Sequence, residues 1–182
     1  MKIRSFLTCL LAMNGTVQAT TTIGDVIMGI NMVVADVTCN INNGKGINQQ
    51  IVMPIISWDE LEKNSVHSTE VPLLVDCRSS ASQPTAISVR LTPANGGGIV
   101  GNGSNGILKT DLAGIGLELT WKKLAGSPPV SLLPGDETVF TAVNGSEGIW
   151  DLSLLAKPIL VHGEIPEMGR YTGMLQINLK YF

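Results

Sequence analysis

Apolar side chains recur at every second position along much of this chain, and the pattern is clearest at its C-terminal end. Four of them lie between residues 174 and 182, at Leu175, Ile177, Leu179 and Tyr181. This is the period of a β-strand with one face toward a core. Most domains fray at their ends, so a core strand that continues to Phe182 suggests that this strand has a role beyond packing.

Shorter segments with the same period follow one another through the body of the chain, separated by Gly and Pro turns. They predict strands at residues 87–92, 115–121, 138–143, 151–155 and 159–161, with Pro158 dividing the last two. One helix of one or two turns is predicted over residues 58–63. The glycine-rich segment 94–106 does not have the Lys-Ser/Thr ending of a phosphate loop, and we interpret it as a plain loop.

These short strands indicate an all-β fold, an immunoglobulin-like β-sandwich in one domain. Aromatic residues make up only 4% of the chain, so apolar bulk is expected from the three tryptophans, Trp58, Trp121 and Trp150. Asp59, Glu60 and Glu62 resemble a paired-carboxylate cluster, but we expect them on a solvated face. Neither an internal repeat nor a linker is visible.

The first nineteen residues have the pattern of a secretory signal peptide. Lys2 and Arg4 precede a short apolar run at residues 6–13, and small residues at Val17 and Ala19 suit a signal peptidase. Cleavage is predicted after Ala19, which makes residues 1–19 the signal peptide. No later apolar run approaches the roughly 20 residues that a membrane-spanning helix needs.

Charge argues against a nucleic-acid partner. Residues 1–19 contain two basic residues and no acidic one, so the mature chain of about 163 residues has ten basic and fifteen acidic side chains, a formal charge near −5. Mild acidity with dispersed charges disfavours binding to nucleic acid or to an anionic membrane surface.

Two cysteines, Cys39 and Cys77, remain after cleavage. An even pair in an oxidising compartment predicts a disulfide. Two free thiols or a metal site are the alternatives. The only histidines, His67 and His162, are not at zinc-ligand spacing from the cysteines, which disfavours a metal site.

A second alternating segment precedes Cys39. On one face of an extended strand it places Thr22, Gly24, Val26, Met28 and Ile30. Such a strand can be donated to another molecule, or it can be an ordinary long first strand that pairs within its own domain. Periodicity alone favours the second reading.

Taken together, these residues resemble the pilin subunits of chaperone–usher fimbriae in Gram-negative bacteria, of the type 1 kind. Cys39 lies within residues 37–41, and Cys77 ends the strand 71–77, both like the disulfide strands of that family. Residues 112–119 resemble its Gly-Ile-Gly strand. Gly169 stands fourteenth from the end and Tyr181 is penultimate, which matches the C-terminal signature of these subunits.

The resemblance implies an incomplete immunoglobulin-like β-sandwich that lacks its last strand, with residues 20–36 as an N-terminal donor-strand extension and residues 37–182 as the pilin domain. A periplasmic chaperone would lend a strand to the open groove, and the donor strand of the next subunit would replace it at the outer-membrane usher. The donor face would be Thr22, Gly24, Val26, Met28 and Ile30. The strand that lines the groove and meets the chaperone would carry Gly169, Tyr171, Leu175, Ile177, Leu179, Tyr181 and Phe182.

The resemblance also implies a place at the cell surface, in a fibre built from head-to-tail contacts between neighbouring pilin subunits. The length of the chain argues against a two-domain tip adhesin. Met28 stands where abundant shaft subunits often have an aromatic residue, which favours a minor or adaptor subunit over the major one. Neither a cofactor nor a metal nor a small-molecule substrate is expected.

Two other classes of function compete with this reading. A freestanding secreted immunoglobulin-like module that binds a glycan or a protein would explain the fold and the disulfide, but not the alternating N-terminal extension. An enzyme is disfavoured because neither histidine lies in a motif, no Gly-x-Ser-x-Gly elbow is present, and no unpaired cysteine remains as a nucleophile.

Overall fold

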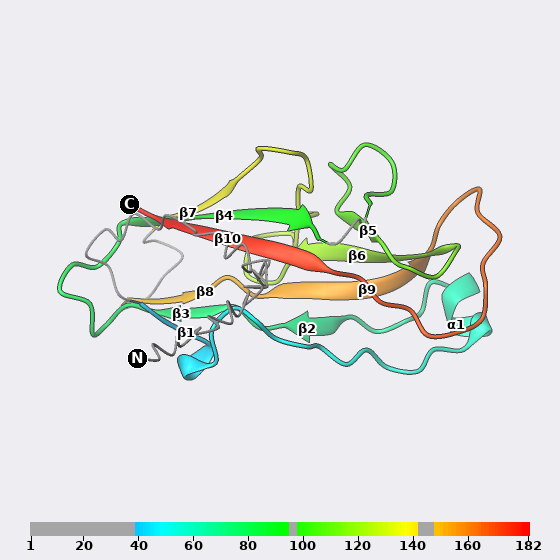
Figure 1. Ribbon diagram of the computed structural model, residues 1–182, viewed down its shortest axis with the longest axis horizontal. Helices are drawn as coiled ribbons and strands as arrows, with labels where there is room; N and C mark the ends of the chain where they lie inside the picture. Colours follow the sequence, from blue (N-terminus) through cyan, green and yellow to red (C-terminus); the bar gives the residue numbers. More distant parts are fainter. Residues whose placement is uncertain (1–38, 95–97, 142–147) are drawn as a thin grey trace, which may run out of the picture. The chain divides into compact units, whose positions relative to one another are not determined.

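The computed structural model describes residues 39–94, 98–141 and 148–182; the predicted signal peptide and donor-strand extension lie outside these residues. The described part of the chain is built from short strands, one α-helix and one 3-10 helix (Figure 1). Their bounds are β1 Asn40–Ile41, η1 Asn42–Gly44, α1 Trp58–Glu62, β2 Thr69–Val71, β3 Leu74–Asp76, β4 Ala86–Pro93, β5 Ile107–Lys109, β6 Ile115–Trp121, β7 Thr138–Thr141, β8 Ile149–Asp151, β9 Leu154–Leu160 and β10 Leu175–Tyr181. The predicted all-β fold is confirmed.

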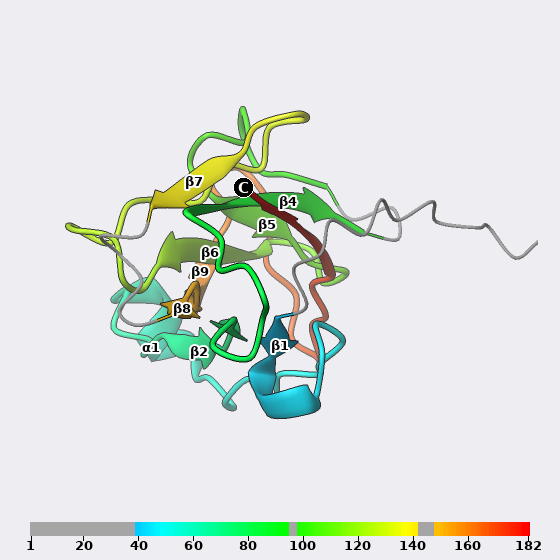
Figure 2. The same ribbon diagram turned by 90° about the vertical axis from the view of Figure 1, so that its left-hand side faces the viewer.

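The strands form two layers. One layer is the sheet β10-β4-β7, and the other contains the sheets β1-β3-β8 and β2-β9-β6-β5, with every strand pair antiparallel. Figure 2 shows the β10-β4-β7 sheet above the second layer. Within that layer the two sheets are joined, because the amide of Leu152 donates to the carbonyl of Leu73 at 2.8 Å and the amide of Leu73 donates to Ser153 Oγ at 3.1 Å.

The core lies between the layers and follows the predicted alternation. On β4, Ile87, Val89 and Leu91 are almost fully buried, and Trp121 at the end of β6 packs edge-on against Phe140 with ring centroids 4.9 Å apart. Trp150 is also buried. The prediction that Trp58 adds apolar bulk to the core is wrong, because this residue lies on the short helix α1 and its side chain is 39% exposed.

The helix forms where it was predicted because its N-terminus is capped. Ser57 Oγ accepts from the amide of Glu60 at 3.3 Å, and the Glu60 carboxylate accepts from the amide of Ser57 at 2.8 Å, which together make a capping box. Asp59, Glu60 and Glu62 are exposed, as expected for a solvated face.

Pro158 does not divide two segments as predicted, since β9 runs through it and pairs it with Leu117 of β6. On its other side, β9 pairs with β2 only at residues 154–156. Proline is tolerated in a strand where no neighbour needs its missing amide hydrogen, and position 158 lies beyond the end of β2.

The described part of the glycine-rich segment, residues 98–106, consists of turns and loop, with an isolated bridge from Ile99 to Leu108. It leads into β5, which was not predicted, and Gly106 is buried with a φ of +69°. A Cβ at this position would lie 2.6 Å from the carbonyl oxygen of Leu119. The position therefore requires glycine both for its backbone conformation and for this close approach.

The predicted strand at residues 138–143 begins as expected, and β7 extends to Thr141, where the described range ends. Among the described residues, no helix is long and apolar enough to cross a membrane.

Candidate functional site

The last strand is an edge strand. β10 pairs with β4 over its whole length, from Leu175 opposite Pro93 to Tyr181 opposite Ile87. Within the described part of the chain, no strand pairs with its other edge. Every second residue, from Leu175 to Tyr181, thus turns its main-chain N–H and C=O toward the free edge, and an unprotected edge of this kind readily accepts another strand.

The alternation of burial extends beyond β10 itself. From residue 171 to residue 182, half-buried and exposed side chains follow one another without interruption. Gly173 belongs to the inward set, and a Cβ there would lie 2.7 Å from Leu117 Cδ1, so the chain runs close against the core at this point. The whole inward set is Tyr171, Gly173, Leu175, Ile177, Leu179 and Tyr181.

The inward side chains of β10 are covered less completely than those of the strand beside it. Ile177, Leu179 and Tyr181 are only half-buried, although they pack against the hydrophobic core. Their cross-strand partners on β4 are at most 1% exposed: Leu91, Val89 and Ile87. Both rows face the same core, but β10 has a neighbouring strand on only one side, whereas β4 is flanked by β10 along its length and by β7 over residues 86–89. We call Leu175, Ile177, Leu179 and Tyr181 the acceptor row.

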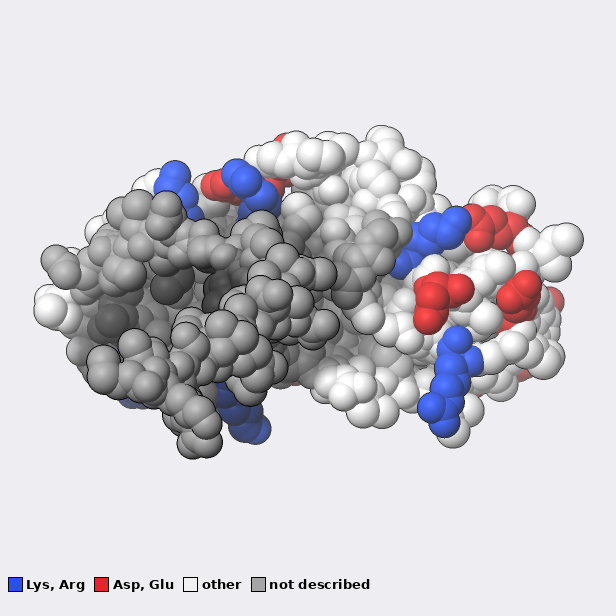
Figure 3. Space-filling model, viewed as in Figure 1, with Lys and Arg blue, Asp and Glu red and all other residues white. Residues whose placement is uncertain are grey.

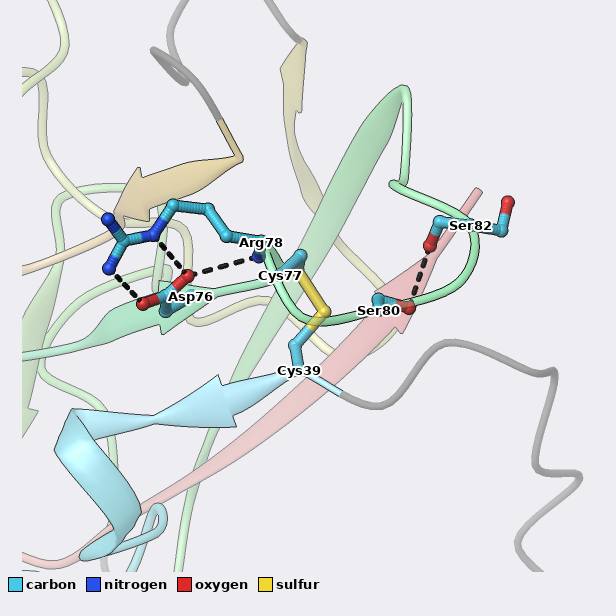
Figure 4. Close-up of a disulfide and its surroundings, with 6 residues drawn as sticks. All are labelled: Cys39, Asp76, Cys77, Arg78, Ser80 and Ser82. Atoms are coloured by element: carbon cyan, nitrogen blue, oxygen red, sulfur yellow. Dashed lines mark hydrogen bonds and ion pairs between the residues drawn. A yellow bond between two sulfur atoms is a disulfide. The ribbon is translucent and has the colours of Figure 1, made fainter.

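A second strand with a free edge, β1, is held in place by the disulfide between Cys39 and Cys77 (Figure 4). This bond joins the residue before β1 to the residue after β3, with the two Cα atoms 4.3 Å apart. Cys39, Ile41 and Met53 are also partly buried against the same core cluster. The core is therefore incompletely covered both along β10 and along the strand that the disulfide anchors.

Electrostatics distinguish the two faces of β10. Burial raises the pKa of Tyr181, and also that of Tyr171, so both hydroxyls stay neutral at physiological pH. The opposite face is polar and exposed, and Lys180 Nζ lies 4.6 Å from the centroid of the Phe182 ring. The carbonyl oxygen of Phe182 accepts from the amide of Thr85 at 2.7 Å, which fixes the end of the strand to the residue before β4.

A family model described as fimbrial protein matches residues 28–182 of the chain. The chain belongs to the fimbrial protein family. It is thus a structural subunit of a surface fimbria rather than an enzyme, and it contacts other subunits. The match begins at Met28, so Thr22, Gly24 and Val26 of the predicted donor face lie before it.

Solved structures show that the fimbrial subunit has the immunoglobulin-like fold of pilins. A P pilus rod subunit, PapA, is 17% identical, with a TM-score of 0.56 over 79% of this chain and 99% of that chain. A subunit in the structure of a chaperone–usher pilus is 20% identical, with a TM-score of 0.61 over 85% of this chain and 93% of that chain. No curated protein matches the sequence of the subunit.

Of the predicted site residues, those at the C-terminal end lie within the described part of the fimbrial subunit. The acceptor row and Tyr171 share one inward face, and Phe182 ends the strand, whereas Gly169 is exposed and lies before the alternating segment. The five donor-face residues lie outside the described residues. Sequence reasoning missed Gly173, although the alternation that marks β10 already extended two steps upstream to Tyr171.

An ion pair beside the disulfide contributes to the stability of the subunit in a way that depends on pH. Arg78 donates to both carboxylate oxygens of Asp76, at 2.9 and 2.6 Å, and these bonds lower the pKa of Asp76 to about 2 from an ordinary value of 3.8. Because the folded pKa lies below the unfolded one, this contribution to stability is present above about pH 4 and is lost as the pH falls toward about 2.

We therefore expect Asp76→Asn to lower the stability of the subunit at neutral pH and to weaken its dependence on pH between about 4 and about 2. Urea unfolding midpoints measured across this range, for the wild type and the variant, give the difference directly. An unchanged acid dependence in the variant would show that Arg78 does not hold this carboxylate in its ionised form.

Proposed function

We propose that this fimbrial subunit polymerises by donor-strand exchange, with β10 as the acceptor strand and residues 20–36 as the strand that it donates. Residues 1–19 are the signal peptide in this proposal, and residues 37–182 are the pilin domain. Thr22, Gly24, Val26, Met28 and Ile30 of one subunit face the acceptor row of the next, so each subunit both gives and receives a strand.

The half-burial of the acceptor row, next to fully buried partners on β4, is the observation that supports the proposal. An added strand along β10 supplies main-chain hydrogen bonds to the free edge, and its alternate side chains cover Leu175, Ile177 and Leu179. Donor positions with apolar side chains at every second residue match this acceptor geometry.

Before assembly, an open edge beside exposed apolar side chains favours aggregation. We propose that a periplasmic chaperone covers it by lending a strand along β10 while the subunit crosses the periplasm, and that basic residues of the chaperone bind the carboxylate of Phe182. The exchange then takes place at an outer-membrane usher. In the subunit alone, Phe182 already bonds to Thr85 and Ala86, so the chaperone must bind without breaking this link or must replace it.

We further propose a minor or adaptor position in the fibre rather than that of the major subunit. Met28 is the residue that supports this choice, since a flexible thioether side chain fills irregular pockets where a rigid aromatic ring would not.

Deleting residues 20–31 tests the division into donor and acceptor. The mature chain and the deletion variant are each expressed in the periplasm with and without a fimbrial chaperone. Both are expected to require the chaperone for a monomeric product, since both contain β10. Only the full mature chain is expected to attach to a further subunit, because the variant has no strand to donate.

Two results would contradict the proposal. If the deletion variant no longer bound the chaperone, the N-terminal segment would belong to the core of its own domain. If the mature chain alone formed a stable monomer, the acceptor edge would not be open. Val139→Ser on β7, an exposed residue that β4 separates from β10, is a matched control that should leave both chaperone binding and attachment unchanged.

A further inference from the structure

The segment between β9 and β10 is fixed to the neighbouring turn by several hydrogen bonds. The Glu164 carboxylate accepts from the amide of Gly114 at 3.0 Å and pairs with Lys109 at 3.1 Å, and both contacts lower the pKa of Glu164. The amide of Glu167 donates to the carbonyl of Ala113 at 3.1 Å. Residues 164–167 are thus held in one position against the turn between β5 and β6.

Close packing reinforces these bonds. Gly114 has a φ of +72°, and a Cβ there would lie 2.4 Å from Pro166 Cα, so the segment lies directly on the turn. Despite this, Ile165 is 87% exposed and Met168 is 89% exposed. Exposed apolar side chains that lie together can mark a binding surface, and these two lie three positions apart in the sequence, within and next to the anchored segment. We call Ile165 and Met168 the apolar tip.

The apolar tip lies at the end of the domain where β10 begins, which is also the end that carries α1 (Figure 1). Trp58 and Ile55, on and before α1, are exposed at the same end. Acidic and basic side chains both lie at that end (Figure 3), and Glu167 between Ile165 and Met168 is exposed.

We propose that the apolar tip contacts the folded domain of a second copy of this chain, the copy whose donor strand lies along β10. This inference rests on the donor-strand exchange proposed above. It adds a second contact between the same two subunits, made by side chains outside both the donor strand and the acceptor row.

The direction of the donor strand determines which part of the second copy arrives at the tip. Every strand pair in the described residues is antiparallel, and an antiparallel donor places its C-terminal end beside Leu175, next to the tip. From Ile30 to Cys39 is nine residues, which span at most about 30 Å. Cys39 of the second copy thus lies within about 30 Å of the point where the donor strand ends beside the tip, so its Cys39 end is the part of that copy that can reach Ile165 and Met168.

The Cys39 end of the domain has a surface that complements the tip. Ile149 lies in the same cross-strand row as Asp76 and Asn40, next to Cys39, and is 36% exposed. Phe182, which bonds to Ala86 at this end, is 54% exposed. Lys180 adds a positive charge there, opposite in sign to Glu167 at the tip.

A contact between opposite ends of identical copies is heterologous and does not close, so it extends a fibre together with the exchanged strands. It requires successive copies of the same chain. Of the two positions proposed above, it therefore favours a minor subunit present in consecutive copies over an adaptor.

The test compares two donors on one acceptor. The acceptor is the mature chain without residues 20–31, held by a fimbrial chaperone, as wild type and as Ile165→Ser with Met168→Ser. One donor is a synthetic peptide of residues 20–38, and the other is the complete mature chain with a second copy of residues 20–31 added behind Phe182, which fills its own edge so that no chaperone covers the Cys39 end. Val139→Ser, on an exposed apolar residue of β7 that shares a cross-strand row with Lys180 at the opposite end of the sheet from the tip, is the matched control.

With the complete chain as donor, we expect the double variant to shorten the half-life of the pair on heating by at least about tenfold, because two large apolar side chains lose their burial. With the peptide as donor, the half-life should not change. The Val139→Ser acceptor should behave like the wild type with both donors.

Three other results would contradict parts of the proposal. If the wild type and the double variant had equal half-lives with the complete chain as donor, the proposed contact of the tip would be refuted, but donor-strand exchange would not. Binding of the peptide without binding of the complete wild-type chain would show that a second copy is not the occupant. Failure of both donors would refute donor-strand exchange, and this inference with it.

Discussion

Moving residues 20–31 from the N-terminus to a position behind Phe182, through a short turn, is expected to raise the free energy of unfolding by about 3 kcal/mol. The moved segment can fold back as an antiparallel neighbour of β10. Covering the exposed halves of Leu175, Ile177 and Leu179 contributes about 1 kcal/mol for each side chain. Burial of the donor side chains offsets the entropy lost when the segment becomes ordered.

Urea unfolding of the rearranged chain and of the mature chain, followed by tryptophan fluorescence, measures this difference. Trp121 and Trp150 are suitable reporters, because both are buried in the core. The rearranged chain should also be a monomer without a chaperone. The matched control carries Val26→Asp and Met28→Asp in the moved segment, and the gain should disappear because two charges would face the core.

An unmodified mature chain that already unfolds at the same urea concentration as the rearranged one would contradict this prediction. It would mean that the half-exposed acceptor row costs the domain little stability. The role of β10 as an incomplete edge would then lose its physical basis.

Replacing both cysteines, Cys39→Ser with Cys77→Ser, is expected to lower the free energy of unfolding by about 4 kcal/mol. The bond joins residues 38 positions apart, and loss of a loop constraint of this length has an effect of about that size in the chain-entropy model. β1 is only two residues long and pairs with β3 through Asn40 and Ile41, so little else holds this strand.

The effect is best measured on the rearranged chain, in which the acceptor edge is filled and the folded state is monomeric. The double variant is compared with the wild type under oxidising conditions and again with a reducing agent. The reduced wild type should resemble the variant. A difference below about 1 kcal/mol would show that β1 stays in place without the bond, contrary to the entropic account.

Strands with strict alternation were predicted well, because their period depends only on neighbouring residues. The predictions for β4, β6 and β10 match the structure. The errors lie where the structure depends on contacts between residues that are distant in the sequence. Pro158 stays within β9 because β2 ends before it, and β5 forms because it pairs with β6.

The candidate site shows the same division. The alternation at the C-terminal end of the sequence and the resemblance to pilins predicted Leu175, Ile177, Leu179 and Tyr181 as site residues. The exposed Ile165 and Met168 could not be predicted in the same way, since their outward positions depend on Glu164 and Pro166 packing against Gly114, some fifty residues away.

By itself, the sequence determined that residues 175–181 form a strand with one apolar face, since a period of two is a local property of the backbone. It also determined the cysteine pair and the family resemblance. Only the tertiary structure decided that this apolar face is half-covered. That depends on β4 lying along one edge of β10 with no described strand along the other, and the number of neighbours of a strand is a property of the whole fold.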